Sequence, residues 1–139
     1  MIILDTNVLS EVVKQAPEQR VIDWLDAQPA VGIATTAVTA AELWYGVRRL
    51  PDGRRKAGLV AGIDAVLYED LQGRIERFDT AAASRYADLV IARECVGQPI
   101  SMADAQIAAI CVSRGAVLAT RNVRDFAGTG IEIVDPWAY

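Results

Sequence analysis

"MIILDTNVLSE", residues Met1–Glu11, brings a short apolar run directly against a carboxylate. Ile2–Leu4 has the composition of a buried strand, and Asp5 follows it with no turn residue between them. An ionised carboxylate that is buried without a partner is energetically costly, so this one requires a partner. A helix N-terminus, a cation or a bound metal ion would each serve, and the remaining residues help to distinguish among them.

The composition predicts a globular protein with a single domain, residues 1–139. Hydrophobic residues make up 53% of the 139 positions and charged residues 23%, which is typical of a globular protein with its own core. We expect a cytoplasmic protein, because no apolar run is long enough to cross a bilayer and no secretory leader is recognisable. The only cysteines, Cys95 and Cys111, lie in helix-like segments and are expected to be reduced core thiols.

The chain contains no histidine, which narrows its possible chemistry. This absence excludes the Ser-His-Asp triad and removes the commonest zinc ligand, so catalysis has to use carboxylates, hydroxyls, lysine or arginine. The net charge of −4 argues against a broad basic surface for nucleic acid. Basic side chains nevertheless form two short groups: Arg48, Arg49, Arg54, Arg55 and Lys56, and further on Arg121 and Arg124.

Apolar periodicity predicts strands and helices in alternation. Short apolar runs indicate five strands: Ile2–Leu4, Val31–Thr35, Arg74–Phe78, Val117–Thr120 and Ile131–Val134. Helical spacing indicates helices at Thr6–Val13, Glu18–Gln28, Thr39–Arg49, Arg54–Leu67, Ala81–Val96 and Ser101–Arg114, and a single turn at Asn122–Phe126. This alternation is typical of an α/β fold in which a central parallel sheet of about five strands is flanked by helices.

Four acidic residues occupy matching places in this pattern. Asp5 ends the first strand, Glu42 and Asp104 are expected in the first turns of two helices, and Asp125 follows the strand Val117–Thr120. In a parallel sheet, strand ends and the starts of the following helices share one edge, where ligands bind. Carboxylates within about 4–6 Å raise one another's pKa values, and a divalent cation relieves that repulsion. Oxygen ligands without histidine or cysteine suit Mg²⁺, with Mn²⁺ as the second candidate.

Helix capping is the alternative explanation for the same acids. Thr39–Glu42, Ser101–Asp104 and Asn122–Asp125 each have the spacing of a capping box, and Asp5 suits an N-cap. Capping does not account for four acids at one edge of one sheet, nor for a bare aspartate directly after an apolar strand. We therefore favour the metal-site interpretation.

With these residues in place, the sequence resembles the PIN-domain ribonucleases, and among them the VapC toxins of bacterial toxin–antitoxin pairs, particularly the FitB-like branch. The resemblance covers essentially the whole chain and rests on four motifs in order: LDTNVLSE (Leu4–Glu11), TAAELWYGV (Thr39–Val47), SMADAQIAA (Ser101–Ala109) and ATRNVRDF (Ala119–Phe126). It implies a three-layer fold and metal-dependent cleavage of RNA phosphodiesters by clustered acids. It also implies a cognate antitoxin as partner, and a homodimer that assembles further with that antitoxin.

The resemblance assigns roles to particular acids. Carried over by position, Asp5, Glu42 and Asp104 are the implied catalytic residues and metal ligands. Where many relatives have a further acid, this chain has Asn122. Asp125 is the other acidic position of that motif and is the candidate fourth catalytic residue and ligand. A metal ion held there would lower the pKa of a bound water, which would attack phosphorus in line with the leaving oxygen.

Three neighbouring polar residues are expected to support this site. Asn7 is placed to orient the loop that begins at Asp5, while Thr6 and Thr120 are placed to position a carboxylate, the phosphate or the turn backbone. Four arginines are candidates for contacting RNA phosphates, which favour arginine: Arg48, Arg49, Arg121 and Arg124. The alternative for the first two is a solvated helix end.

Other functions fit the residues less well. An aspartyl-phosphate receiver domain needs a late lysine, and the chain has none after Lys56. A catalytically silent PIN-fold binding module would not need Asp5, Glu42 and Asp104, which are all present. A PIN nuclease that acts on DNA is a third alternative, which the sequence does not exclude.

Two predicted helices carry more apolar residues than one small sheet face needs, namely Glu18–Gln28 and Arg54–Leu67. We expect their apolar faces to form a groove for an antitoxin helix. Because the acid cluster is anionic, an arginine of the antitoxin is the natural group to enter it.

Overall fold

Strand β1 (Ile2–Leu4) lies at the centre of the sheet in the computed structural model, which describes all 139 residues. It pairs in parallel with β2 (Ile33–Thr36) on one side and with β4 (Val117–Ala119) on the other. The short strands β3 (Ile75–Glu76) and β5 (Ile133–Val134) complete the order β3-β2-β1-β4-β5, again in parallel. The expected parallel sheet of five strands is therefore confirmed.

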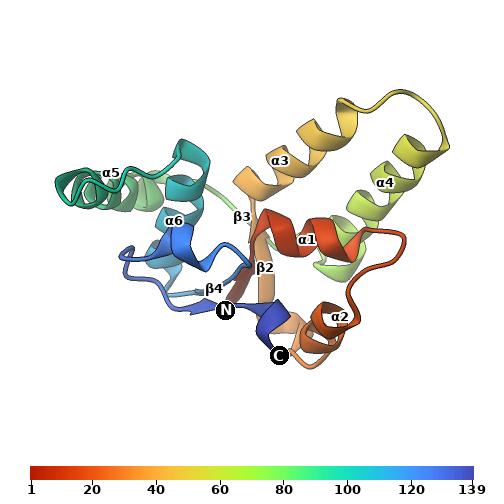
Figure 1. Ribbon diagram of the computed structural model, residues 1–139, viewed down its shortest axis with the longest axis horizontal. Helices are drawn as coiled ribbons and strands as arrows, with labels where there is room; N and C mark the ends of the chain where they lie inside the picture. The colour runs from red at the N-terminus through yellow and green to blue at the C-terminus, as the bar shows by residue number, and fades with distance from the viewer.

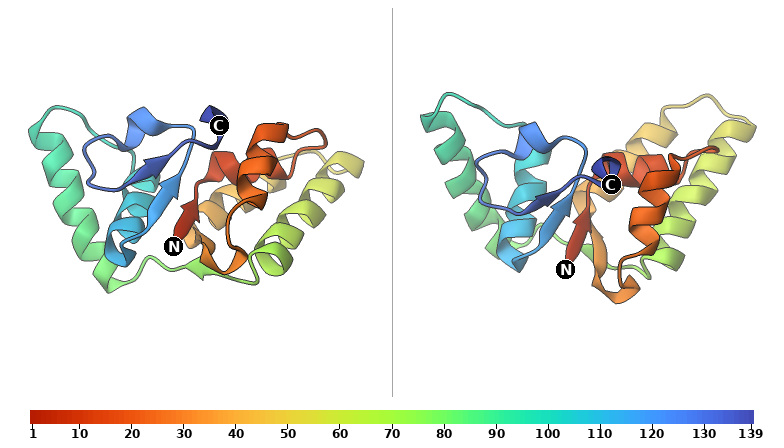
Figure 2. Two further views of the ribbon diagram at one scale, coloured as in Figure 1. Left: turned by 90° about the horizontal axis from the view of Figure 1, so that it is seen from below. Right: turned by 60° about the horizontal axis from the view of Figure 1, so that its bottom comes forward.

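Helices cover both faces of this sheet, which gives the three layers of the expected fold (Figures 1 and 2). They are α1 (Thr6–Val12), α2 (Gln19–Asp26), α3 (Ala37–Arg48), α4 (Arg54–Asp64), α5 (Thr80–Cys95) and α6 (Met102–Arg114). Helices α1 to α4 pack on one face, and α5 and α6 pack on the other. None of these helices has the length and apolar content that a membrane span requires.

The apolar run of β1 is explained by two separate hydrophobic cores. Successive side chains of a strand point to opposite faces of the sheet. Leu4 packs in one core with Leu9 and Leu43 of the α1–α4 layer. Ile3 is fully buried in the other core, with Ile107 of α6. A strand that is buried on both faces requires a continuous apolar run rather than an alternating one.

Helix α3 begins earlier than the sequence pattern predicts, and this changes the position of Glu42. Thr36, at the end of β2, is the N-cap, and its hydroxyl accepts a hydrogen bond from the N–H of Thr39 at 3.0 Å. Glu42 therefore lies in the second turn of α3, so the prediction of a first-turn position was wrong. The proposed capping box Thr39–Glu42 is also wrong, because a threonine three residues earlier supplies the cap.

The segment Arg54–Leu67 is not one regular helix, as the periodicity predicted. Helix α4 ends at Asp64, and the chain continues as a π-helical stretch, η2 (Ala65–Asp70). Val66 and Leu67 of η2 are both buried in the α1–α4 core. Three single 3₁₀ turns complete the chain: η1 (Ala30–Gly32), η3 (Val123–Phe126) and η4 (Pro136–Ala138).

The two cysteines lie in different environments, and both are free thiols. Cys111 of α6 is buried, as expected, and burial raises the pKa of its thiol to about 12. Cys95, the last residue of α5, is exposed, so the prediction of a core thiol was wrong for this residue.

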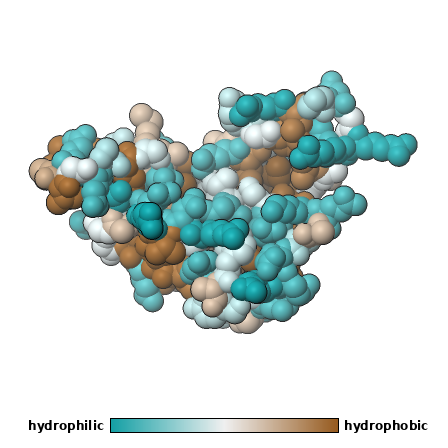
Figure 3. All heavy atoms as spheres, viewed as in Figure 1, coloured by the Kyte–Doolittle hydropathy of each residue, from teal (hydrophilic) through white to brown (hydrophobic).

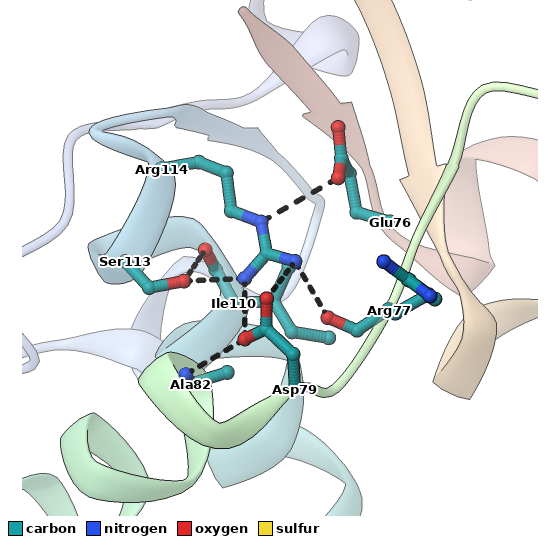
Figure 4. A network of polar contacts seen from close by, with 7 residues as sticks. All are labelled: Glu76, Arg77, Asp79, Ala82, Ile110, Ser113 and Arg114. Atoms are coloured by element: carbon teal, nitrogen blue, oxygen red, sulfur yellow. Dashed lines mark hydrogen bonds and ion pairs between the residues drawn. The ribbon is translucent and has the colours of Figure 1, made fainter.

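Arg114, the last residue of α6, holds the chain where it passes from β3 into α5 (Figure 4). Its guanidinium donates to Asp79 Oδ2 at 3.2 Å and to the carbonyl of Arg77 at 2.7 Å, and it lies 3.5 Å from Glu76 Oε2. Asp79 also caps α5 by accepting a hydrogen bond from the N–H of Ala82. This bond, together with Arg114, holds the pKa of Asp79 below its ordinary value. The crossover between the two helical layers is therefore pinned by one arginine.

Candidate active site

Asp5 receives its partners from the start of α1 and the end of β4. Its side chain is almost fully buried, with 3% of the residue exposed. Oδ1 accepts a hydrogen bond from the N–H of Thr6 at 2.8 Å, and Oδ2 accepts one from the hydroxyl of Thr120 at 2.8 Å and one from the amide of Asn7 at 3.2 Å. Asp5 is thus the N-cap residue of α1, but three donors do not fully offset its environment. Burial raises the pKa of Asp5 above its ordinary value.

Repulsion from two other acids adds to that rise. Asp104 and Glu42 both contribute charge that raises the pKa of Asp5. The pKa of Asp104 is raised as well, first by burial and then by repulsion from Asp125 and Glu42. Asp104 lies in the first turn of α6, where the Ser101 hydroxyl accepts a hydrogen bond from its N–H at 3.2 Å. The start of α6 is therefore capped by Ser101.

Asn7 and Thr120 tie the loop after β4 to the start of α1. The side-chain oxygen of Asn7 accepts from the N–H of Arg121 at 3.0 Å, while its amide group donates to the Thr120 hydroxyl at 3.1 Å. The same hydroxyl accepts from the N–H of Asn122 at 3.0 Å. These bonds make Asn7 and Thr120 residues that orient the Asp5 carboxylate and the β4 loop together.

Thr6 performs the corresponding role for Glu42. The Thr6 hydroxyl donates to Glu42 Oε1 at 2.7 Å and lies 3.2 Å from the hydroxyl of Thr39, which is fully buried. Because Thr6 begins α1 and Glu42 lies on α3, this contact ties the two helices together at the carboxyl edge of the sheet.

An open, polar cavity of about 440 Å³ brings the acids together. Only one of its 11 lining residues is hydrophobic. The lining residues are Asp5, Thr6, Asn7, Ser10, Glu11, Lys14, Glu42, Asp104, Arg121, Asn122 and Trp137. Three of the four acids identified from the sequence thus share one cavity, and they come from the end of β1, from α3 and from α6.

Asp125 and Asn122 take different positions around this cavity. Asn122 lines it, whereas Asp125 lies outside the lining on the exposed turn η3. Asp125 is still near enough for its charge to raise the pKa of Asp104. Asn122 makes no side-chain capping bond at η3, so the capping box Asn122–Asp125 suggested by the spacing is absent.

The candidate RNA-contacting arginines are divided between two places. The guanidinium of Arg121 lines the cavity and lies over the ring of Trp137, 5.0 Å from its centroid. Arg48 and Arg49 lie instead over the rings of Trp44 and Tyr45 on their own helix. Arg124 is exposed on η3 and is not part of the cavity lining. Of these four arginines, only Arg121 faces the carboxylates.

The sequence reasoning missed four residues of the cavity wall, namely Ser10, Glu11, Lys14 and Trp137. Glu11 is buried and pairs with Lys14 at 3.1 Å, and it accepts a hydrogen bond from the N–H of Glu18. Burial tends to raise the pKa of Glu11, but these two partners hold it below the ordinary value. Glu11 ends the LDTNVLSE motif, which was a usable signal. Trp137 reaches the cavity through the C-terminal turn, which no local pattern indicates.

The donor set fits a hard divalent cation. The cavity contains carboxylate, hydroxyl and amide oxygens, with no histidine or thiol among its lining residues, which suits Mg²⁺ or Mn²⁺. No three acidic side chains stand together as a ready-made metal cage, so an ion would have to draw them closer. Burial and then repulsion between the acids raise the pKa values of Asp5 and Asp104, and a bound cation would relieve that repulsion.

These raised pKa values predict how the stability of the metal-free protein depends on pH. A carboxyl group whose pKa is raised in the folded state contributes stability that is fully present below its ordinary pKa of 3.8 and is lost as the pH rises through the folded value. The melting temperature of the wild type should therefore fall as the pH rises above 3.8. We expect it to fall less steeply in Asp5→Asn and in Asp104→Asn.

Thermal melting in EDTA across this pH range measures the effect. Glu11 and Asp79 act in the opposite direction, because their lowered pKa values make their contribution present above the ordinary values and lost on acidification. Asp79→Asn is the matched control. It should lower the melting temperature at pH values above the ordinary pKa of Asp79, but the melting temperature should still fall with rising pH as it does in the wild type. Wild-type and Asp104→Asn profiles of identical shape would contradict the expectation.

Comparison with known proteins identifies the family that shares this sequence and fold. The PIN-domain family model matches residues 2–131. The VapC ribonuclease Y4jK of Sinorhizobium fredii is 38% identical over 137 residues, covering 99% of this chain and 98% of that protein. The toxin FitB of Neisseria gonorrhoeae is 34% identical, with 99% of each chain covered.

Solved structures of toxin–antitoxin complexes contain chains with the same fold. The crystal structure of FitAcB from Neisseria gonorrhoeae matches with a TM-score of 0.92 and 34% identity over 100% of both chains. DNA-bound VapBC from Salmonella typhimurium matches with a TM-score of 0.81 and 27% identity, covering 97% of each chain. Because the family model matches residues 2–131 and the similarity to Y4jK extends over nearly the whole chain, this chain belongs to the PIN-domain family.

Proposed function

We propose that this protein is a metal-dependent endoribonuclease and the toxin of a toxin–antitoxin pair. The observation that carries the proposal is the convergence of Asp5, Glu42 and Asp104, from three separate elements, on one polar cavity. Two of these carboxyls have raised pKa values, as expected of a site that takes up a cation. Similarity to a VapC ribonuclease supports RNA as the substrate, and similarity to the toxin FitB supports the role of a toxin.

The residues that would hold Mg²⁺ or Mn²⁺ are Asp5, Glu42 and Asp104. When bound, such an ion supplies Lewis-acid stabilisation of the phosphate and a nucleophilic water at neutral pH. The chain's own residues do the orienting. Thr120 and Asn7 hold the Asp5 carboxylate through hydrogen bonds of 2.8 and 3.2 Å, so that its charge is directed into the cavity.

Arg121 is the side chain best placed to bind a substrate phosphate. Its backbone is fixed by Asn7, its guanidinium is supported by the Trp137 ring, and it belongs to none of the protein's ion pairs. A guanidinium without a carboxylate partner is free to form the paired hydrogen bonds that phosphates accept.

A cleavage assay with matched oligonucleotides tests this function. Single-stranded RNA and DNA of the same sequence are incubated with the protein in Mg²⁺, in Mn²⁺ and in EDTA. We expect cleavage of RNA in the presence of either metal and none in EDTA. Cleavage that persists in EDTA would exclude the metal-dependent mechanism, and equal cleavage of the DNA would favour the alternative of a DNA nuclease. Metal binding without any cleavage would favour a silent binding module.

We also propose that Asp125 contributes to the metal site although it lies outside the cavity lining. Its charge acts on Asp104, and Asn122, which does line the cavity, offers only a neutral oxygen. Asp125→Asn should therefore raise the Mg²⁺ concentration needed for half-maximal cleavage about tenfold, the lower range for a residue that supports a metal ligand. Asn122→Asp should lower that concentration.

Metal titrations of cleavage rate, with melting temperatures measured in parallel, separate this role from a structural one. If Asp125 only stabilised the η3 turn, Asp125→Asn would lower the melting temperature and leave the metal titration unchanged. That outcome would leave a site of three carboxylates. Asp52→Asn is a suitable control, because Asp52 has a fully exposed side chain.

The antitoxin is expected to bind the apolar groove between α3 and α4. A cavity of about 290 Å³ opens there, and Figure 3 shows apolar side chains gathered between these helices. Its apolar lining residues are Val13, Leu43, Val47, Leu50, Leu59 and Ile63. Thr6 and Glu42 line both this groove and the acid cavity. An antitoxin segment in the groove therefore has a direct path for an arginine to reach the acids.

A second apolar cavity, of about 370 Å³, lies between α2 and η2. Ile22 and Leu25 of α2 and Val66 of η2 line it. The two apolar faces expected from the sequence therefore border two separate cavities. Only the cavity between α3 and α4 has lining residues in common with the acid cavity. Relatives of known structure include the FitAB and VapBC complexes, which supports an antitoxin partner for this chain.

A further inference from the structure

Arg93 is a buried cation that the proposed mechanism does not use. It lies in the last turn of α5, with 8% of the residue exposed. None of the protein's ion pairs includes it. A buried guanidinium without an ion-pair partner is costly, so its retention calls for an explanation.

The guanidinium of Arg93 joins three segments of the chain. Nε donates to the carbonyl of Gln98 at 2.6 Å, and Nη1 donates to the carbonyls of Asp125 at 3.1 Å and Ala127 at 2.7 Å. The last two carbonyls flank Phe126, which is 1% exposed and belongs to the α5–α6 core. Arg93 and Phe126 together hold η3 against α5.

Two of the candidate metal-site acids depend on these segments. Gln98 belongs to the connection that leads to Ser101, the N-cap of the helix that carries Asp104. Asp125 is itself bonded through its carbonyl, so the position of its backbone is set by Arg93. One side chain thus links the start of α6 to the turn that carries the fourth acid.

We infer that Arg93 is a positioning residue of the metal site, which sets the distance between Asp104 and Asp125 by bonding the backbone on both sides. This inference rests on the proposed metal-dependent function. The charge of Arg93 has a separate effect of opposite sign, because a nearby cation attracts Asp104 but repels a metal ion. Positioning and charge can therefore be separated by substitution.

Two substitutions and one matched control make this separation. Arg93→Lys keeps the charge but cannot bond three carbonyls in the fixed geometry of a guanidinium. Arg93→Met removes the charge and all donors while keeping an apolar side chain of considerable length. Arg114→Met is the control, because Arg114 also pins a crossover by bonding a carbonyl and a carboxylate. Ten residues of α6, about 15 Å of helix, separate Arg114 from Asp104.

The measurement is Mn²⁺ binding by isothermal titration calorimetry on the folded proteins, with circular dichroism and thermal melting for each variant. We expect Arg93→Lys to weaken Mn²⁺ binding about tenfold, as is typical when a residue that orients metal ligands is lost. Arg93→Met should weaken it less, because removing the cation partly offsets the loss of positioning. Arg114→Met should lower the melting temperature and leave the Mn²⁺ affinity within about twofold of wild type, since it does not orient a ligand.

The outcomes that would contradict the positioning role of Arg93 can be told apart from one another. Unchanged affinity in Arg93→Lys would overturn the inference and make Arg93 a structural brace, and tighter binding in Arg93→Met with an unchanged Lys variant would show a charge effect alone. A wild-type protein that binds no Mn²⁺ would overturn the proposed function together with this inference. If Arg93→Met does not fold, Arg93→Lys decides the question by itself.

Discussion

Asp5→Asn is expected to abolish RNA cleavage while the protein stays folded. The amide retains an oxygen for the N–H of Thr6 or the hydroxyl of Thr120, but it lacks the negative charge that a metal ligand supplies. Loss of a residue that only orients a metal ligand costs about 10–100-fold, so loss of a central ligand should cost at least about a hundredfold. Cleavage rates at fixed Mg²⁺ give the result directly.

The melting temperature of the same variant tests the physical basis of this effect. Without metal, Asp5→Asn should melt at or above the wild-type temperature, because a buried and repelled carboxylate is removed. Added Mn²⁺ should stabilise the wild type, by about 2.7 kcal/mol at a hundred times the dissociation constant, and the variant much less. Asp52→Asn, at an exposed position, is the control for both measurements. Undiminished cleavage by a folded Asp5→Asn protein would refute the metal site.

The second large effect is expected from Leu59→Glu, which should abolish capture of the antitoxin. Leu59 lies on α4 and lines the groove between α3 and α4. Exchanging the buried contact of a leucine for a carboxylate costs about 3 kcal/mol or more, which is at least a hundredfold in affinity. Co-expression with the gene adjacent to that of this protein, followed by pull-down, measures retention of the partner.

The neighbouring residue on the same helix provides the control. Val60 is 38% exposed and is absent from the groove lining, so Val60→Glu should retain the partner. Leu59→Glu should keep its RNA cleavage activity, because Leu59 does not line the acid cavity. Equal recovery of the antitoxin with both variants would place its binding site elsewhere.

Local patterns in the sequence were sufficient for the order of the elements and for three acids that line one cavity. Ile2–Leu4 reads as a strand buried on both faces because its apolar run does not alternate, and the structure places it at the centre of the sheet. Gly115 ends α6 in the left-handed conformation that glycine favours. Parallel strands share one carboxyl edge, so Asp5 and Asp104 could be placed near one another from their order in the chain alone.

Where two residues suited the same role equally well, the sequence did not decide between them. The sequence pattern began the helix at Thr39, but threonine also caps well at position 36, and only the end of β2 selects Thr36, which moves Glu42 to the second turn. Asn122 and Asp125 are both oxygen donors, and the direction of the η3 turn places Asn122 alone in the cavity lining.

The sequence by itself therefore determined the α/β fold, the order of its elements and the acids that follow them, because these depend on periodicities of two and 3.6 residues within short segments. The tertiary structure decided which groups surround those acids. Trp137 supports Arg121 across 16 positions of sequence, and Arg93 bonds the carbonyl of Asp125 across 32 positions. Such contacts come from the packing of separate elements, which leaves no local pattern in the chain.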